Sequence, residues 1–307
     1  MSVLAVVGPT ASGKSAAALD IARARIAAGR PTEVVAVDAF TVYRGMDIAT
    51  AKPSADERAE VPHHLVDVLQ PDEKLTVADF QRRARSALED VRARGRVPLL
   101  VGGAGLYWRA VVDDLRFPPT DPRLRAELEN RFDDPVAAHE RLAHLDPAAA
   151  ERIEPANLRR TVRALEVIEL TGQAFSSFAT AWDEHRSIYP DLTVGYLEPP
   201  GERLRAAIDE RARRMVDEGL LTEAAELRRR FRLSSTAAQA IGYAEAFAVL
   251  DGDLEEAQLA EAIRRRTWRY AKRQRSWFRA DPRCVAEVPD RLLARLAAAG
   301  RQGDTPW

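Results

Sequence analysis

The sequence predicts an α/β fold with a parallel sheet core and an inserted small helical domain. Early in the chain, short apolar runs alternate with segments of helical spacing, and this alternation requires parallel crossover connections. Strand signals then stop near Phe117, where a stretch rich in Arg, Ala, Glu and Leu begins. We therefore expect the core at residues 1–119 and 186–290, the helical insertion at 120–185 and a loose tail at 291–307.

Four apolar or β-branched runs are predicted as strands. They lie at residues 3–7, 33–37, 97–101 and 193–197. Apolar residues at helical spacing predict helices at 77–94, 202–219, 222–231, 237–250 and 254–278. The run at 193–197 returns the chain to the core after the insertion.

Composition is that of a globular protein, with 46% hydrophobic and 30% charged residues in 307. The apolar runs are too short for a membrane span or a signal peptide. The single cysteine, Cys284, cannot form an intramolecular disulfide, which fits a reducing compartment. We expect a cytoplasmic monomer without membrane contact.

The net charge of −1 conceals a strongly basic segment near the C-terminus. Eight basic residues and no acidic one lie between Arg264 and Arg279, interleaved with Trp268, Tyr270, Trp277 and Phe278. A run of this kind is either a solvated helix face or an RNA-binding surface. The interleaved aromatic residues favour RNA contact, because they suit packing or base stacking beside phosphate contacts.

A phosphate-binding loop follows the first predicted strand. Its residues match G-x-x-x-x-G-K-[ST] and are Gly8, Pro9, Thr10, Ala11, Ser12, Gly13, Lys14 and Ser15. Backbone N–H groups of such a loop and the following helix N-terminus bind phosphate oxygens. Lys14 supplies positive charge to the terminal phosphate and Ser15 a hydroxyl to Mg²⁺. The motif predicts a P-loop NTPase-like core.

The motif leaves the bound phosphate compound undecided. Nucleotidases and kinases usually end the third strand with an Asp that helps to hold Mg²⁺. Here that strand ends VPLLVGG without a carboxylate, which disfavours the ordinary NTPase reading. A P-loop small-molecule kinase stays an alternative.

Asp38 is the candidate general base. It ends the second predicted strand, at the carboxyl edge where ligands of open α/β sheets bind. There it could accept a proton from an attacking amine or hydroxyl. A turn or helix-capping Asp explains the position equally well.

Seven segments together resemble the tRNA dimethylallyltransferase family, also called tRNA isopentenyltransferase. They are GPTASGKS from Gly8, VDAFTVYRGMDIATAKP from Val37, VPHHLVDV from Val61, VGGAGLY from Val101, TVRALEVIELTG from Thr161, AIGY from Ala240 and YAKRQRSWFR from Tyr270. The P-loop alone is common to many families, whereas this ordered combination is specific.

The resemblance implies transfer of a dimethylallyl group from dimethylallyl diphosphate, with Mg²⁺, to N6 of the adenosine 3′ of the anticodon in tRNA. Lys14 and Asp38 are then the catalytic residues, and the helical insertion grips the anticodon stem-loop. The tRNA-binding residues it implies are Asp38, Ala39, Phe40, Thr41, Ala104, Arg125, Arg160, Arg163, Gln239, Gly242, Tyr243, Lys272, Arg273, Gln274, Trp277 and Arg279.

This chain departs from the family pattern at a few positions. Ala39, Phe40 and Thr41 stand where the family often has Ser after the base and Gln or Leu three positions on. Ala104 stands where a Thr or Ser is common, and Ala49 replaces a glycine. These changes keep an RNA-binding protein without activity as an alternative to the tRNA enzyme. An enzyme that prenylates free adenine nucleotides is a further alternative, although the helical insertion and the basic segment count against it.

Two other pairs have simpler interpretations. His63 and His64 are adjacent on an extended segment and lack nearby ligands at metal spacing, which favours hydrogen-bonding roles over a metal site. Glu166 and Glu169 read as charges on a helix surface.

Overall fold

The computed structural model describes residues 2–178 and 184–299. The chain divides into two compact units, one formed by Met1–Val112 with Tyr189–Trp307 and the other by Asp113–Ile188. The second unit thus begins before residue 120 and ends after residue 185, the bounds expected from the sequence. An isolated antiparallel bridge between Asp113 and Ser187 joins its two ends, which explains why it starts and finishes there.

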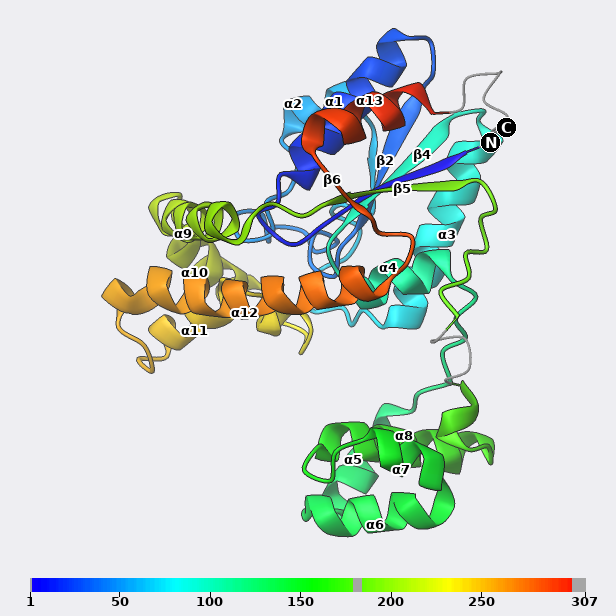
Figure 1. The fold of residues 1–307 in the computed structure, drawn as a ribbon. Coiled ribbons are helices and arrows are strands. Elements are labelled where there is room, and N and C mark those ends of the chain that lie inside the picture. The colour runs from blue at the N-terminus through cyan, green and yellow to red at the C-terminus, as the bar shows by residue number, and fades with distance from the viewer. Residues whose placement is uncertain (1, 179–183, 300–307) are drawn as a thin grey trace. The chain divides into compact units, whose positions relative to one another are not determined.

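The first unit contains a parallel sheet of strand order β3-β2-β4-β1-β5-β6 (Figure 1). The strands are β1 (Val3–Val7), β2 (Thr32–Val37), β3 (His63–His64), β4 (Val97–Gly102), β5 (Leu192–Leu197) and β6 (Ala286–Glu287). The predicted parallel α/β core and its four strands are confirmed. The edge strands β3 and β6 were not predicted, because two residues are too few to show an apolar period.

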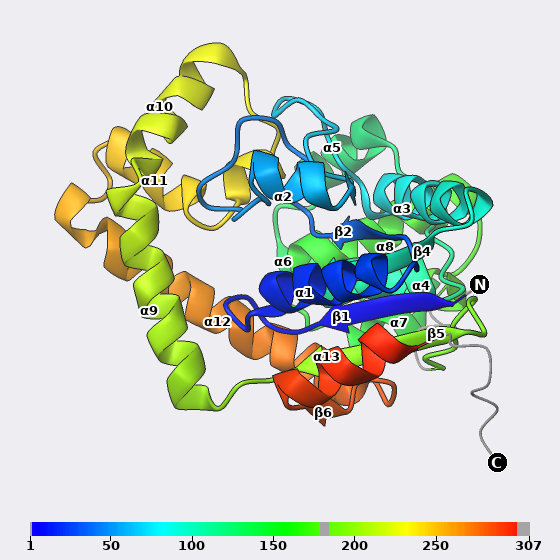
Figure 2. The ribbon, with the colours of Figure 1, turned by 90° about the horizontal axis from the view of Figure 1, so that it is seen from above.

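Helices cover both faces of this sheet. On one face α1 (Lys14–Ala27) and α13 (Pro289–Ala298) lie side by side (Figure 2). The opposite face carries α3 (Val77–Ala93) and α4 (Gly105–Val112), and the short α2 (Ala55–Glu60) leads into β3. Alternate strand residues divide between the two cores, with Leu4 and Val6 toward α1 and Val3, Ala5 and Val7 toward the other layer.

The expectation of a loose tail from residue 291 is wrong for residues 291–298. They belong to α13, whose Leu292 and Leu296 are fully buried against the sheet. The buried side chain of Arg25 donates hydrogen bonds to the carbonyls of Leu296 and Ala299, which caps the end of this helix. The sequence signal was a short apolar period hidden among charged and alanine residues. Residues 300–307 lie outside the described part of the chain.

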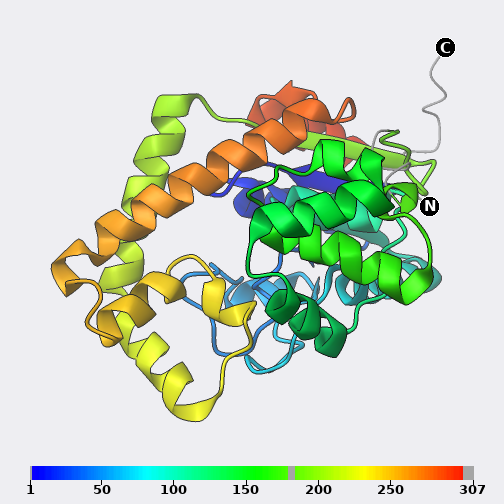
Figure 3. The same ribbon diagram turned by 90° about the horizontal axis from the view of Figure 1, so that it is seen from below.

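The C-terminal part of the first unit is helical. Its elements are α9 (Gly201–Asp217), α10 (Leu220–Arg230), η3 (Ala237–Gln239), α11 (Tyr243–Leu250), η4 (Glu256–Gln258) and α12 (Leu259–Ala280). Helix α9 packs against α12, and α10 against α11 (Figure 3). The helix expected at 237–250 is interrupted at Gly242, whose positive φ of 97° cannot continue a helix.

The second unit is entirely helical in its described residues. It comprises α5 (Pro122–Arg131), α6 (Pro135–Leu145), α7 (Pro147–Arg152), α8 (Leu158–Thr171) and η1 (Phe175–Phe178). The first three helices start with a capping Asp followed by Pro, the pattern that best satisfies the free N–H groups of a first turn. Leu128, Leu142 and Leu165 lie in its small core.

The interpretation of Glu166 as a surface charge is wrong. Its carboxylate is completely buried and accepts hydrogen bonds from the Thr120 hydroxyl, the Asp121 amide and two arginines, Arg125 and Arg163. Burial alone would raise the pKa of Glu166, but the hydrogen bonds from the arginines outweigh it and lower the pKa. Glu169, one turn later, is a surface residue that pairs with Arg131.

Candidate active site

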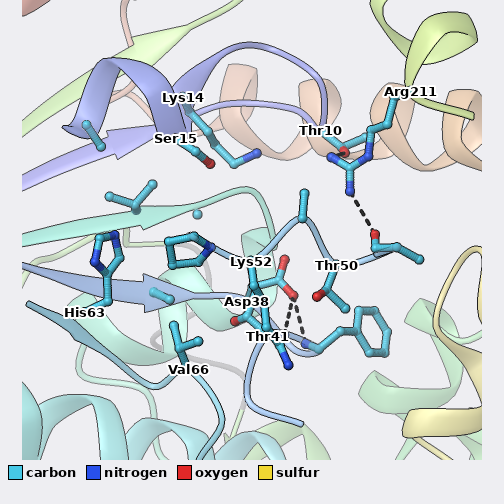
Figure 4. Close-up of a pocket in the computed structure, with 18 of the residues that line it drawn as sticks. Thr10, Lys14, Ser15, Asp38, Thr41, Thr50, Lys52, His63, Val66 and Arg211 are labelled. Atoms are coloured by element: carbon cyan, nitrogen blue, oxygen red, sulfur yellow. Dashed lines mark hydrogen bonds between the residues drawn. The ribbon is translucent and has the colours of Figure 1, made fainter. Parts of the chain in front are cut away.

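A cavity of about 370 Å³ opens at the carboxyl edge of the sheet (Figure 4). Its lining includes several separate parts of the first unit, together with the ends of β2 and β4. These parts are the phosphate loop and start of α1, the segment after β2, residues 49–53, the middle of α9 and the inner face of α12, and Glu57, His63, Val66, Ala240 and Ile241 complete the wall. Carboxyl edges of parallel strands are where ligands of such folds bind, because loops and helix N-termini converge there.

The phosphate loop has the backbone that its motif requires. Gly13 and Ala11 adopt positive φ angles of 84° and 62°, so the chain turns tightly between β1 and α1. A Cβ at Gly8 would lie 2.5 Å from the carbonyl oxygen of Leu197, so only glycine fits against the end of β5. This local geometry leaves Thr10, Lys14 and Ser15 on the cavity wall.

Lys14 points its ammonium group into the cavity (Figure 4). Its Nζ donates one long hydrogen bond, 3.3 Å, to the Pro9 carbonyl. Burial and, less strongly, the charge of Arg211 together lower the pKa of Lys14 to about 8, although the carboxylate of Asp38 opposes both effects. An anion bound at this position would compensate the buried charge.

Asp38 lines the same cavity from the end of β2. Its Oδ1 accepts hydrogen bonds from the backbone amides of Phe40, at 2.8 Å, and Thr41, at 3.4 Å. The residue is therefore a turn Asp and a cavity carboxylate at once, so the two interpretations of its position do not exclude each other. The turn holds the carboxylate in place relative to the sheet.

The end of β4 separates the phosphate loop from Asp38, because β4 lies between β1 and β2 in the sheet. Its last residues are glycines that leave no room for a side chain. A Cβ on Gly102 would lie 2.2 Å from the Val37 carbonyl, and one on Gly103 would lie 2.7 Å from the Gly8 carbonyl. The close approach of three strand ends explains why no carboxylate follows this strand.

Gln274 was expected to contact tRNA, but its amide is engaged inside the protein. The side chain is almost fully buried, accepts a hydrogen bond from Thr10 N and donates one to the Gly103 carbonyl, both 2.8 Å. It thereby joins α12 to the phosphate loop and the end of β4. The sequence did not indicate that it lies on the inner face of α12, because basic residues flank it on both sides.

Arg211 is a cavity residue that sequence reasoning missed. From α9 it donates hydrogen bonds to the Thr10 hydroxyl, at 3.2 Å, and to the Ala49 carbonyl, at 2.9 Å (Figure 4). Burial lowers its pKa, while the nearby Asp38 raises it. Several arginines occur in this helix, and no local signal distinguishes the one that faces the cavity.

Two further residues expected to bind tRNA are buried in the first unit. Tyr243 is fully buried, and its hydroxyl donates a hydrogen bond to the Glu223 carboxylate. Gly242 packs against Ala49. Both residues are buried in this structure, so neither presents a side chain at the surface for RNA contact. The AIGY segment, residues 240–243, links η3 to α11, and its Ala240 and Ile241 line the cavity.

The other residues between 239 and 279 that were expected to bind tRNA lie at the surface. Gln239, Lys272, Arg273 and Trp277 are exposed, Trp277 by 41%. Arg279 is exposed too, but it pairs with the nearly buried carboxylate of Glu198. Outside the cavity, the basic face of α12 is therefore open to solvent at several of the expected positions.

The residues that follow Asp38 divide between wall and core. Phe40 and Thr41 line the cavity, whereas Ala39 is buried outside its wall. Ala104, just before α4, is also buried and lies outside the cavity lining. The departures of this chain that face the cavity are thus Phe40, Thr41 and Ala49.

Within the second unit, Arg125 and Arg163 both bind the buried Glu166. Arg163 also donates to the carbonyls of Pro118 and Pro119. Both guanidinium groups stay partly exposed, with side-chain exposures of 39% and 25%. Arg160 is exposed at the start of α8.

Both histidines make hydrogen bonds. Nδ1 of His63 lies 2.6 Å from the Val61 carbonyl, and Nε2 of His64 lies 2.7 Å from the buried carboxylate of Glu33. In residues 2–178 and 184–299, no three His, Cys, Asp or Glu side chains gather into a metal-binding cluster. Those same residues include no helix long and apolar enough to cross a membrane.

The cavity suits a Mg²⁺ ion that arrives with a diphosphate. Mg²⁺ keeps several waters and takes one or two protein oxygens beside phosphate oxygens, rather than a cage of protein ligands. Ser15, at the N-terminus of α1, presents its hydroxyl on the wall beside Lys14. This donor set fits the ion only in company with a phosphate compound.

Comparisons with known proteins agree with this geometry. The family model of the IPP transferases matches residues 41–281. The chain is 52% identical to a tRNA dimethylallyltransferase of Kineococcus radiotolerans and 47% identical to one of Thermobifida fusca, over 92% of this chain and 89% and 88% of the relatives. These alignments span most of each protein.

Solved structures are similar over comparable lengths. The full-length tRNA isopentenylpyrophosphate transferase of Bacillus halodurans is 37% identical with a TM-score of 0.69, covering 96% of this chain and 94% of that one. A eukaryotic dimethylallyltransferase acting on tRNA is 25% identical with a TM-score of 0.76, covering 90% of this chain and 69% of that one. The chain belongs to the IPP transferase family.

Proposed function

We propose that this enzyme transfers a dimethylallyl group from dimethylallyl diphosphate to N6 of the adenosine 3′ of the anticodon in tRNA. The observation that carries the proposal is that Lys14 of the phosphate loop and the Asp38 carboxylate line one cavity. A site of this kind can bind a diphosphate leaving group beside a proton acceptor. The names of the relatives, tRNA dimethylallyltransferase, support this choice of reaction.

In the proposed reaction the N6 amine forms a bond to C1 of the donor while the C1–O bond to the diphosphate breaks. The allylic carbon carries positive charge in the transition state, so the chemistry needs neutralisation of the leaving group and alignment of the amine more than a strong nucleophile. The phosphate-loop amides, Lys14 and Arg211 stabilise the developing negative charge. Asp38 receives the proton that N6 loses.

Mg²⁺ held by the diphosphate and the Ser15 hydroxyl would neutralise further charge on the leaving group. The protein's own part is to hold the two reactants within reach of each other. Asp38 is oriented by its hydrogen bonds from Phe40 and Thr41, and Arg211 is tied to Thr10 of the phosphate loop. Fixed groups of this kind cost no reorganisation as charge develops.

The RNA substrate requires basic, exposed surface. Lys272 and Arg273 on α12 and Arg160 on α8 supply exposed basic side chains, and the exposed Trp277 of α12 supplies an aromatic ring. We assign them to the tRNA anticodon stem-loop and expect their contacts to weaken with salt. The enzyme acts as a monomer in the cytoplasm, where unmodified tRNA is found.

The test is transfer of radiolabelled dimethylallyl from its diphosphate to unmodified tRNA, with AMP as a parallel acceptor. Asp38→Asn is the informative variant, because the amide oxygen can still accept the Phe40 and Thr41 hydrogen bonds while the base is lost. We expect label in tRNA with the wild type and at least a hundredfold loss in the variant. Label in AMP alone indicates a nucleotide prenyltransferase, and phosphate transfer from ATP indicates a kinase.

A further inference from the structure

We infer that Lys52 and Glu223 are positioning residues that hold one wall of the cavity at its working distance from the phosphate loop. The inference rests on the proposed function. The wall consists of residues 47–53, called here the wall segment, of which Ala49, Thr50, Ala51, Lys52 and Pro53 line the cavity.

The wall segment has no regular secondary structure of its own. Ala51 adopts a positive φ of 49°, which costs free energy for a residue with a Cβ. Within the segment, the Thr50 hydroxyl donates to the Met46 carbonyl, a bond that shapes one turn only. The position of the segment therefore depends on side chains that tie it to its neighbours.

Lys52 makes three such ties. Its Nζ donates to the Tyr43 carbonyl, to Oδ1 of Asp47 and to Oδ1 of Asp67, at 2.5, 2.6 and 2.5 Å. The side chain is only 4% exposed although it borders the cavity. An ammonium group has three protons, and all three are used.

The two lysines of the cavity consequently have different roles. Lys14 makes one long hydrogen bond of 3.3 Å and keeps donors for a phosphate. All three donors of Lys52 are engaged within the protein, so it is unsuited to bind the diphosphate. Its charge holds together Asp47, at the start of the wall segment, and Asp67, on the loop after β3.

Glu223 anchors the same segment from α10. Its carboxylate accepts hydrogen bonds from the backbone amides of Asp47 and Ile48, at 3.3 and 3.2 Å, and from the hydroxyl of Tyr243, at 2.5 Å. The next residue, Ala49, packs on Gly242, where a Cβ would meet it at 2.6 Å. The segment is thus pinned to α10 and to the start of α11.

Arg211 completes the connection to the phosphate loop, since it binds the Ala49 carbonyl and the Thr10 hydroxyl. Lys52 and Glu223 act on the reaction only through this wall. A misplacement of about 1 Å can cost about a hundredfold in rate, so partial loosening of the wall is expected to cost about tenfold in kcat. Affinity for the leaving group should change little, because the phosphate loop is intact and Arg211 keeps its hydrogen bond to the Thr10 hydroxyl.

The experiment compares Lys52→Met and Glu223→Ala with two matched controls. Arg58→Met removes the other cation that pairs with Asp67. Arg58 is exposed and lies outside the cavity lining. Glu223→Gln keeps an acceptor for the two amides. For each protein we would measure kcat and KM for prenyl transfer, the Kd of inorganic diphosphate, and hydrogen exchange of a peptide spanning residues 47–53.

We expect Lys52→Met and Glu223→Ala to lower kcat about tenfold and to speed exchange in the wall segment, with the Kd of diphosphate within about twofold of wild type. The controls should resemble wild type. The inference fails if Lys52→Met weakens diphosphate binding as much as it lowers kcat, if Arg58→Met is equally damaging, or if both test variants lose their fold.

Hydrogen exchange separates this inference from the proposed function. A wild type that transfers no prenyl group defeats the proposed function, yet faster exchange in Lys52→Met than in Arg58→Met would still support the anchoring of the wall. Unchanged exchange in both test variants defeats the anchoring, whatever the activity of the wild type.

Discussion

Gln274 accepts a hydrogen bond from the backbone amide of Thr10, 264 residues earlier in the chain. Together with its bond to the Gly103 carbonyl, this contact ties the phosphate loop to α12. Gln274→Leu leaves the part-buried Thr10 amide and the buried Gly103 carbonyl without this partner, which costs about 1.4 kcal/mol or more. We expect inorganic diphosphate to bind about tenfold more weakly, measured by titration calorimetry. Gln173→Leu, at an exposed position, should bind as wild type does, and equal affinities for both variants would refute the role of Gln274.

Arg211 should contribute to diphosphate binding through its guanidinium group at the phosphate loop. Arg211→Met is expected to raise the Kd of inorganic diphosphate about tenfold and to lower the transfer rate, because one charge-assisted contact is lost. Arg213→Met, at an exposed position of the same helix, serves as control. If the two variants bind diphosphate alike, Arg211 does not contact the leaving group.

Glu166 and Glu169 should contribute very differently to the stability of the helical unit, although both lie on α8. Glu166→Ala leaves Arg125 and Arg163 beside an empty buried site, and we expect it to reduce the free energy of unfolding of the helical unit by about 3 kcal/mol. Glu169→Ala breaks a surface pair and should cost less than about 1 kcal/mol. Chemical denaturation followed by circular dichroism measures both, and a small effect of Glu166→Ala would contradict the buried network.

Stability in acid should depend on Glu33. Hydrogen bonds from Arg94 and His64 outweigh the effect of burial and lower the pKa of Glu33 from 4.5 to about 2. Because the folded pKa is the lower one, this carboxylate stabilises the fold above pH 4.5 and loses that contribution as the pH falls toward 2.

The variant Glu33→Gln should therefore show a flatter decline of unfolding free energy between pH 4.5 and 2, by up to about 1.4 kcal/mol per pH unit. Glu226→Gln, which breaks an exposed pair with Arg229, is the control. An unchanged slope in Glu33→Gln would show that this carboxylate does not titrate as its contacts indicate.

Substitutions at Gly242 and Ala49 should have coupled effects on stability, because the two residues are in contact. Gly242→Ala forces a Cβ into the space of Ala49 and into a positive φ, and we expect a loss of about 2 kcal/mol in stability. Ala49→Gly in the same chain removes the steric part and should restore roughly half of that loss, while the backbone strain of about 1 kcal/mol remains. Additive effects in a double-mutant cycle would argue against the contact.

Much of the catalytic core follows from local patterns. The period of the apolar residues predicts the strands, and the glycine spacing predicts the phosphate loop before α1. Asp38 is recognisable because a strand ends there. These features involve residues close together in the chain, where backbone geometry allows few arrangements.

Partners far apart in sequence were not predictable in the same way. Arg211 and Gln274 lie in helices crowded with charged residues, where a period of 3.6 shows which face is apolar but not which polar side chain meets a cavity. The resemblance implied tRNA contact for Tyr243 in the AIGY segment, whereas its buried hydroxyl donates a hydrogen bond to Glu223 from another helix.

The sequence alone determined the parallel α/β core, the phosphate loop, the acid at the end of β2 and the resemblance to the IPP transferases. Only the tertiary structure decided which charged groups are buried and paired. The physical reason is that a buried charge is tolerated when a partner of opposite charge or a set of hydrogen-bond donors reaches it, and such partners come from distant segments. Glu166 with Arg125 and Lys52 with Asp67 are pairs that folding alone brings together.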